Sequence, residues 1–64
     1  MTPQWDREAV RATVYALPGQ TAQEIADQLE LTPAVASVCL RDLEVYGSVE
    51  AWDDGEGLRW FPTL

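Results

Sequence analysis

The sequence predicts a small α+β domain in which three helices precede a two-stranded β-hairpin. Three observations lead to this prediction. Two helix-start signals lie close together, at Thr21 and Thr32, and Gly47 is placed to end the helix that follows the second of them. Beyond Gly47, two short segments rich in aromatic and β-branched residues flank a glycine-containing loop, as in a hairpin. With 64 residues, the chain is expected to form one domain spanning residues 1–64.

The first helix is expected to begin at Thr2-Pro3, an N-cap followed by a proline at the first helical position, and to end at Leu17 before Pro18-Gly19. Helical periodicity predicts that its core stripe is Val10, Val14 and Leu17. A shallower stripe about 120° away either covers the edge of the domain or meets the hairpin or a second chain. It contains Trp5, Ala9, Ala12 and Ala16.

The second and third helices both carry clear start signals. Thr21 and Glu24 have the spacing of a capping box, so a helix is expected from Ala22. Thr32-Pro33 starts the next helix, which is expected to run to Gly47. The predicted core stripe of the second helix is Ala22, Ile25, Ala26 and Leu29, and that of the third is Ala36, Cys39, Leu40, Leu43 and Gly47.

The opposite side of the third helix is expected to face solvent. It carries Ala34, Val38, Arg41 and Val45, with Val35 and Asp42 on one flank and Ser37 on the other. Several apolar side chains on one outward helical stripe are typical of a contact surface. Isolated exposed apolar residues are also common on folded proteins, so this pattern alone does not identify a partner.

The hairpin is predicted from residues 49–52 and 58–61, joined by an acidic loop, residues 53–57. If Gly55-Glu56 are central in the loop, Ala51 faces Trp60 and Trp52 faces Arg59. The last two then form a candidate cation-π pair on the outer side. In this register the residues on the core side are Val49, Ala51, Leu58 and Trp60.

These elements resemble a known family. The pattern Ile25-Ala26…Leu29…Leu31-Thr32-Pro33…Leu40-Arg41-Asp42-Leu43-Glu44…Gly47-Ser48-Val49 is similar to the winged helix-turn-helix domains of the MarR-like regulator group, over about residues 8–62. The resemblance implies that the third helix is a recognition helix and that the hairpin is a wing. It also implies a regulator that binds duplex DNA as a dimer, and the positions that match such a role are Thr32, Ser37, Arg41 and Arg59.

The net negative charge of the chain argues against DNA binding. Eleven Asp and Glu residues against four Arg give a net charge of −7, and every charged residue from 42 through 56 is acidic. Phosphate neutralisation drives most nucleic-acid affinity, so a typical DNA-binding domain is basic. The outward positions of the third helix are mainly valine and alanine, which make no bidentate contact with a base.

Catalysis and metal binding find little support in the sequence. The chain has no His, and its one Cys, Cys39, lies on the expected core face. The acidic cluster at 53–56 lacks the alternating ligand spacing of a calcium loop and is read as a solvated turn. No cofactor or small-molecule ligand is indicated. Without a disulfide framework, a leader-like start or a long apolar run, the chain is expected to be cytoplasmic and to have no membrane partner.

Two functions therefore remain. The first is a non-enzymatic protein that binds a partner with a basic surface, as an adaptor or as an inhibitor that mimics the charge of nucleic acid, like small phage antagonists of similar size and charge. Its expected binding residues are Ala34, Val35, Val38, Arg41, Val45, Asp53, Asp54 and Glu56. The alternative is the DNA-binding regulator that the resemblance implies. A homodimer is compatible with either function.

Overall fold

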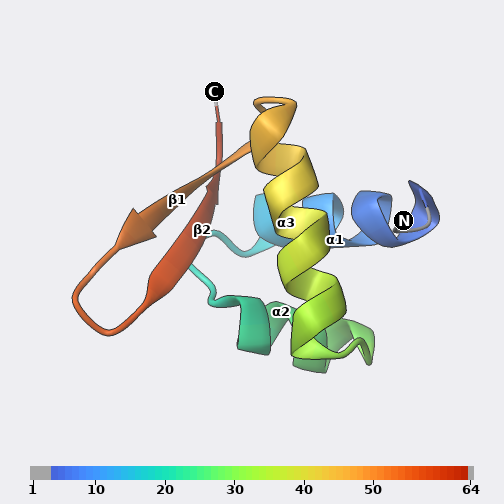
Figure 1. The fold of residues 1–64 in the computed structure, drawn as a ribbon, viewed down its shortest axis with the longest axis horizontal. Helices are drawn as coiled ribbons and strands as arrows, with labels where there is room; N and C mark the ends of the chain where they lie inside the picture. Colours follow the sequence, from blue (N-terminus) through green and yellow to red (C-terminus); the bar gives the residue numbers. More distant parts are fainter. Residues whose placement is uncertain (1–3, 64) are drawn as a thin grey trace.

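The computed structural model of the chain describes residues 4–63 and shows three helices followed by an antiparallel hairpin (Figure 1). The predicted α+β order of elements is therefore confirmed. The elements are α1 (Gln4–Ala16), α2 (Ala22–Leu29), α3 (Pro33–Val45), β1 (Val49–Asp53) and β2 (Leu58–Pro62). The predicted helix start at Thr2-Pro3 and the predicted packing of the Trp5 side chain lie outside what the structure describes.

One hydrophobic core joins all three helices to the hairpin. Its buried residues are Val10, Val14, Ile25, Cys39, Leu40, Leu43, Val49 and Trp60. The predicted inward stripes are thus largely confirmed. Ala22 and Leu29 are partly buried and pack against the core, but two other members of the stripes are exposed. Leu17 is 54% exposed, because α1 ends at Ala16 and the helical period no longer sets the direction of the next side chain. Gly47 is exposed because it lies beyond the end of α3.

The predicted helix caps are present. The Thr21 hydroxyl accepts from the Glu24 amide at 3.2 Å, and the Glu24 carboxylate accepts from the Thr21 amide at 2.9 Å. The Thr32 hydroxyl accepts from the Val35 amide at 3.2 Å, which caps α3. Each bond satisfies a backbone donor that has no partner within its helix.

The end of α3 also follows the prediction. Gly47 has a φ of 79°, the left-handed conformation that glycine adopts without steric cost. The Ser48 amide donates to the Leu43 carbonyl at 2.8 Å, and the Gly47 amide donates to the Glu44 carbonyl at 2.9 Å. This pair of bonds is a Schellman motif, which closes the helix and turns the chain into β1.

The hairpin has the predicted register, with Ala51 opposite Trp60 and Trp52 opposite Arg59. The prediction that Leu58 belongs to the core side of the hairpin and is buried is wrong, because Leu58 is 50% exposed. Leu58 shares a face with Trp60 but begins β2, next to the hairpin loop and beyond the edge of the core.

The segment between α1 and α2 does more than turn the chain. The Gly19 amide donates to the Trp60 carbonyl at 2.8 Å, and the Trp60 amide donates to the Gln20 carbonyl at 2.9 Å. Gln20 thus forms an isolated antiparallel bridge with Trp60. This bridge attaches β2 to the start of α2 and fixes the hairpin beside the helices.

Candidate binding surface on the third helix and the hairpin

The outward side of α3 lies where the helical period places it. Ala34, Ser37, Val38 and Arg41 are all exposed, and so is Val45. Val38 is 47% exposed and Val45 is 83% exposed, so a valine stripe faces solvent. Val35, which was predicted to take part in binding, is half-buried and packs against the core. It can offer a partner only an edge of its side chain.

Further apolar side chains are exposed on the segments that flank α3. Tyr46, Trp52 and Leu58 are 72%, 60% and 50% exposed, respectively. The sequence interpretation did not assign a role to Tyr46. The sequence did carry one indication that Tyr46 is exposed: it comes directly before the glycine that ends the helix, and there the chain turns away from the core. The Arg7 guanidinium lies over the Tyr46 ring, with its central carbon 5.9 Å from the ring centroid.

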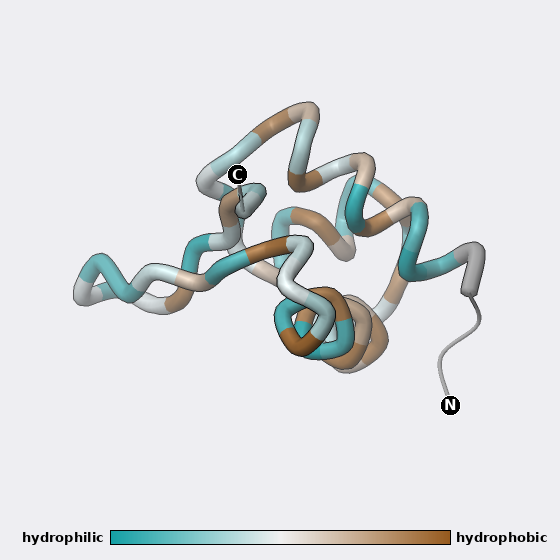
Figure 2. Tube along the Cα trace, turned by 90° about the horizontal axis from the view of Figure 1, so that it is seen from above, coloured by the Kyte–Doolittle hydropathy of each residue, from teal (hydrophilic) through white to brown (hydrophobic). Residues whose placement is uncertain are grey.

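The hairpin tip, residues 53–57, carries three acidic side chains that differ in their surroundings. An Asp53 carboxylate oxygen accepts from the Gly55 amide at 2.8 Å, and an Asp54 carboxylate oxygen accepts from the Glu56 amide at 2.9 Å. These bonds shape the loop. Figure 2, which looks along α3, shows the tip projecting from the body of the protein with hydrophilic residues at its end. Asp53, Asp54 and Glu56 are all exposed.

Asp54 also forms an ion pair with Arg59, whose Nε lies 2.5 Å from the second Asp54 oxygen. The hydrogen bond from Arg59, together with the one from the Glu56 amide, holds the pKa of Asp54 below its ordinary value of 3.8. The same hydrogen bond raises the pKa of Arg59. Within residues 4–63, Asp54 is therefore the one tip carboxylate that forms an ion pair with an arginine, and Asp53 and Glu56 present their charge to solvent.

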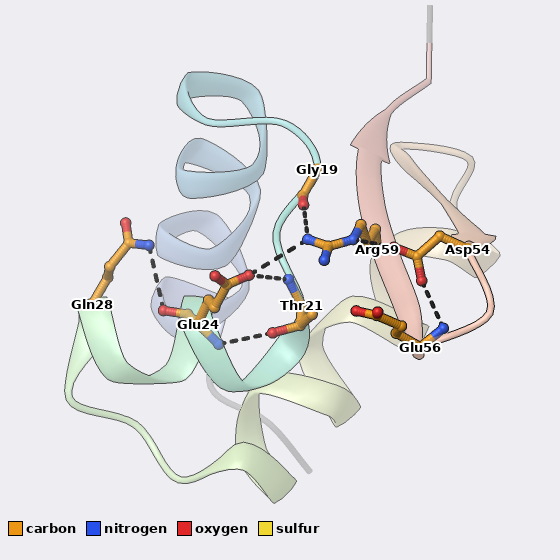
Figure 3. A network of polar contacts seen from close by, with 7 residues as sticks. All are labelled: Gly19, Thr21, Glu24, Gln28, Asp54, Glu56 and Arg59. Carbon is orange, nitrogen blue, oxygen red and sulfur yellow. Dashed lines mark hydrogen bonds and ion pairs between the residues drawn. The ribbon is translucent and has the colours of Figure 1, made fainter.

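Arg59 lies at the centre of a polar network between the hairpin and the helices (Figure 3). Its Nη1 donates to the Gly19 carbonyl at 3.0 Å and lies 4.0 Å from a Glu24 carboxylate oxygen. Within residues 4–63 the predicted Arg59–Trp52 cation-π pair is not observed, because the guanidinium is drawn to these oxygens. The cation-π contacts that the structure shows are Arg7 with Tyr46 and Arg11 with Tyr15.

A groove of about 590 Å³ lies between α3, the start of α2 and the hairpin. It is lined by Thr21, Ala22, Gln23, Ser37, Arg41, Glu56, Gly57, Leu58 and Trp60. The structure thus brings together two residues of the DNA-binding prediction, Ser37 and Arg41, with one residue of the acidic tip. The other two DNA-binding candidates have intramolecular partners, since the Thr32 hydroxyl caps α3 and Arg59 binds Asp54.

Comparison with protein-family models, with curated proteins and with solved structures found no match for this chain. None of the helices in the described residues combines the length and apolar composition needed to cross a bilayer. Within the same residues, no group of three or more Asp, Glu or Cys side chains is arranged to hold a metal ion.

Proposed function

We propose that the chain is a winged-helix protein that binds a protein partner with a basic surface, and that it is not an enzyme. The outward side of α3 acts as the apolar part of the interface, and the hairpin acts as an acidic wing. The observation that carries the proposal is the exposure of Val38 and Val45 on the helix that a winged-helix regulator would place on DNA. Protein interfaces commonly combine an apolar centre with a polar rim of complementary charge.

The arginine contacts support the preference for protein over DNA. Of the four arginines, Arg59 is held by Asp54 and Glu24, and Arg7 lies 4.0 Å from Asp42. DNA affinity grows with the number of phosphates that cations neutralise. Two compensated arginines and a net charge of −7 leave little positive charge for that purpose. The same acidic residues would attract a partner rich in Lys and Arg.

A domain with this surface has two ways to act on such a partner. As an adaptor, it would hold the partner next to another protein. As an inhibitor, its carboxylates would occupy the place of nucleic-acid phosphates on a nucleic-acid-binding protein and would block that site by competition. Both forms require the apolar helix face and the acidic wing together.

The alternative is a small DNA-binding regulator that acts as a dimer. One observation favours it specifically: Ser37 and Arg41 are both exposed on α3 and line the same groove. In this alternative, Ser37 and Arg41 would contact the major groove from α3, and the acidic tip would have to lie away from the phosphates.

A pair of charge variants separates the two functions. The double variant Asp53→Ser, Glu56→Ser removes tip charge without touching the Asp54–Arg59 pair. The double variant Glu8→Ser, Asp27→Ser removes the same charge from exposed positions on α1 and α2. For a protein partner captured from the source cells, the tip variant should weaken binding and reduce its salt dependence more than the control variant does. For duplex DNA, the tip variant should strengthen binding, since repulsion is removed.

A gel-shift series with duplex DNA at low salt completes the test. The proposal expects no sequence-selective retardation. Retardation that depends on sequence and is lost in Arg41→Ala would instead establish the DNA-binding alternative.

A further inference from the structure

We infer that the groove between α3 and the hairpin receives an amphipathic partner helix on which an apolar residue is flanked by a carboxylate and a base. This inference rests on the proposed function and specifies the partner chemistry at that surface. The partner carboxylate pairs with Arg41 on the α3 wall, the apolar side chain packs on the groove floor, and the partner base pairs with Glu56 on the hairpin wall.

The size and lining of the groove fit such a segment. Its volume of about 590 Å³ exceeds that of one side chain and falls within the range of sites that bind ligands. Ala22, Leu58 and Trp60 supply its apolar lining, and Leu58 is half exposed, so an incoming apolar side chain would remove it from water. Burial of apolar area at Leu58 is the favourable contribution that a polar ligand would not obtain.

The two walls of the groove carry opposite charges, Arg41 on α3 and Glu56 on the hairpin, and the two side chains do not pair with each other. Within residues 4–63, Arg41 makes no ion pair, hydrogen bond or ring contact, in contrast to Arg7, Arg11 and Arg59. Glu56 lines the same groove from the hairpin, and its carboxylate is not paired with Arg41. Figure 3 shows the Glu56 side chain directed away from Asp54, on the side of the start of α2.

This arrangement disfavours a polyanion and a purely basic segment alike. A polyphosphate would satisfy Arg41 but would meet Glu56, on the opposite wall, as a like charge. A partner segment with basic residues only would pair with Glu56. It would also place a positive charge beside Arg41 while excluding water from it, and burying two like charges in this way is energetically unfavourable. A helix with an acid and a base on one face satisfies both walls, and the order of its charges sets the orientation in which it docks.

The inference is tested with defined peptides and backbone amide NMR of the 64-residue chain. The probe is a capped, alanine-based helical peptide with Glu, Leu and Arg at four-residue spacing on one face. The control peptide has the same composition with the three residues distributed around the helix. The probe should shift the amide signals of Ser37, Arg41 and Leu58 and the indole signal of Trp60, and the control should bind at least about five-fold more weakly.

A charge-reversal cycle identifies the pairing. Arg41→Glu should bind the Glu-Leu-Arg peptide about five-fold more weakly than the wild-type chain does, and should bind an Arg-Leu-Arg peptide correspondingly better. Arg41 is exposed, so the variant should keep a dispersed spectrum, which the same measurement verifies. Rescue by the Arg-Leu-Arg peptide cannot arise from a general loss of structure.

Three results would overturn the inference: no localised shifts with the probe at millimolar concentration, equal binding of the control peptide, or shifts at Ser37 and Arg41 with duplex DNA but not with the probe. The last result would assign the groove to a polyphosphate. If the peptides fail while Val38→Glu still abolishes capture of a protein partner, the proposed function stands and the groove is not part of its interface.

Discussion

Replacing Val38 by Glu tests whether the outward side of α3 is a binding surface or part of the core. Val38 lies in the middle of α3 and is 47% exposed, whereas Leu40, two residues further along, is fully buried. If this assignment of faces is right, Val38→Glu abolishes partner binding but leaves the domain folded. If Val38 contributes to the core, a buried carboxylate would unfold it.

The size of the effect follows from the exposure. Full burial of a valine side chain is worth about 1.5 kcal/mol, so losing the buried half of Val38 costs about 0.8 kcal/mol. Glu has a better helix propensity than Val by a few tenths of a kcal/mol. The new carboxylate would lie one turn from both Arg41 and Asp42, so its attraction to Arg41 and its repulsion from Asp42 roughly cancel. The net cost is about 0.5 kcal/mol, which corresponds to a fall in Tm of about 2–4 °C for a domain of this size.

Urea denaturation followed by circular dichroism measures this difference, with Leu40→Ala as the buried control. Leu40→Ala should cost about 2–5 kcal/mol, because it leaves a cavity in the core. A domain of 64 residues has a total stability of about 3–10 kcal/mol, so the control should lose much of it. A loss of more than about 2 kcal/mol in Val38→Glu, or the absence of a cooperative transition, would refute the assignment of α3 faces.

Three further predictions concern the ends of the helices and the hairpin tip. Glu30 ends α2 with a left-handed φ of 58°, a conformation that Asn adopts more easily than Glu. Glu30→Asn should therefore raise the unfolding free energy by about 1 kcal/mol. Glu30→Gln, which removes only the negative charge at the helix C-terminus, should raise it by about 0.3 kcal/mol. Gly47→Ala should lower it by about 1 kcal/mol from backbone strain alone, since nothing lies within 4 Å of the added Cβ. The unfolding free energies of the Glu30 and Gly47 variants are measured by urea denaturation. A Gly47→Ala variant more stable than the wild-type chain would contradict the Schellman motif at the end of α3. The folded-state pKa of Asp54 is lowered, so its contribution is fully present above pH 3.8, its ordinary pKa, and is lost as the pH falls through the folded value. The Tm difference between the wild-type chain and Asp54→Asn should therefore vanish in acid, and a difference that persists there would exclude the ion pair as its cause.

The elements of the fold could be predicted because their signals are local. The hydroxyls of Thr21 and Thr32 act within three residues, and the glycine at 47 acts through its own backbone. Helical and strand periods then identified the buried residues of each element. The errors at Leu17 and Leu58 both fall at the ends of elements. Leu17 lies just past α1, where the helical period no longer directs its side chain, and Leu58 begins β2 beyond the edge of the core.

The contacts that position the hairpin could not be predicted, because they join residues that are far apart in the sequence. Arg59 and the Gly19 carbonyl are separated by 40 positions, and the bridge between Gln20 and Trp60 by the same number. No periodicity marks such a pair. The left-handed conformation of Glu30 at the end of α2 could not be predicted, because glutamate rarely adopts a positive φ.

For the candidate site, the valine stripe on α3 followed from the helical period, but the groove did not. Its walls belong to three segments whose spacing depends on the hairpin position, and therefore on the Gln20–Trp60 bridge together with the Arg59 network.

Arg59 joins the hairpin to the segments before and within α2. One guanidinium contacts the tip at Asp54, the segment before α2 at Gly19, and α2 itself at Glu24. These contacts hold the hairpin wall at a fixed distance from the helices, and they also remove Arg59 from the set of cations that could meet a phosphate. Two of the eleven acidic residues thus act on the fold through Arg59, and the acidity of the chain is not only a property of its surface. A scaffold that holds its own arginine in this way keeps the groove beside an anionic outer surface, and the proposed partner helix, with an acid and a base on one face, requires both features.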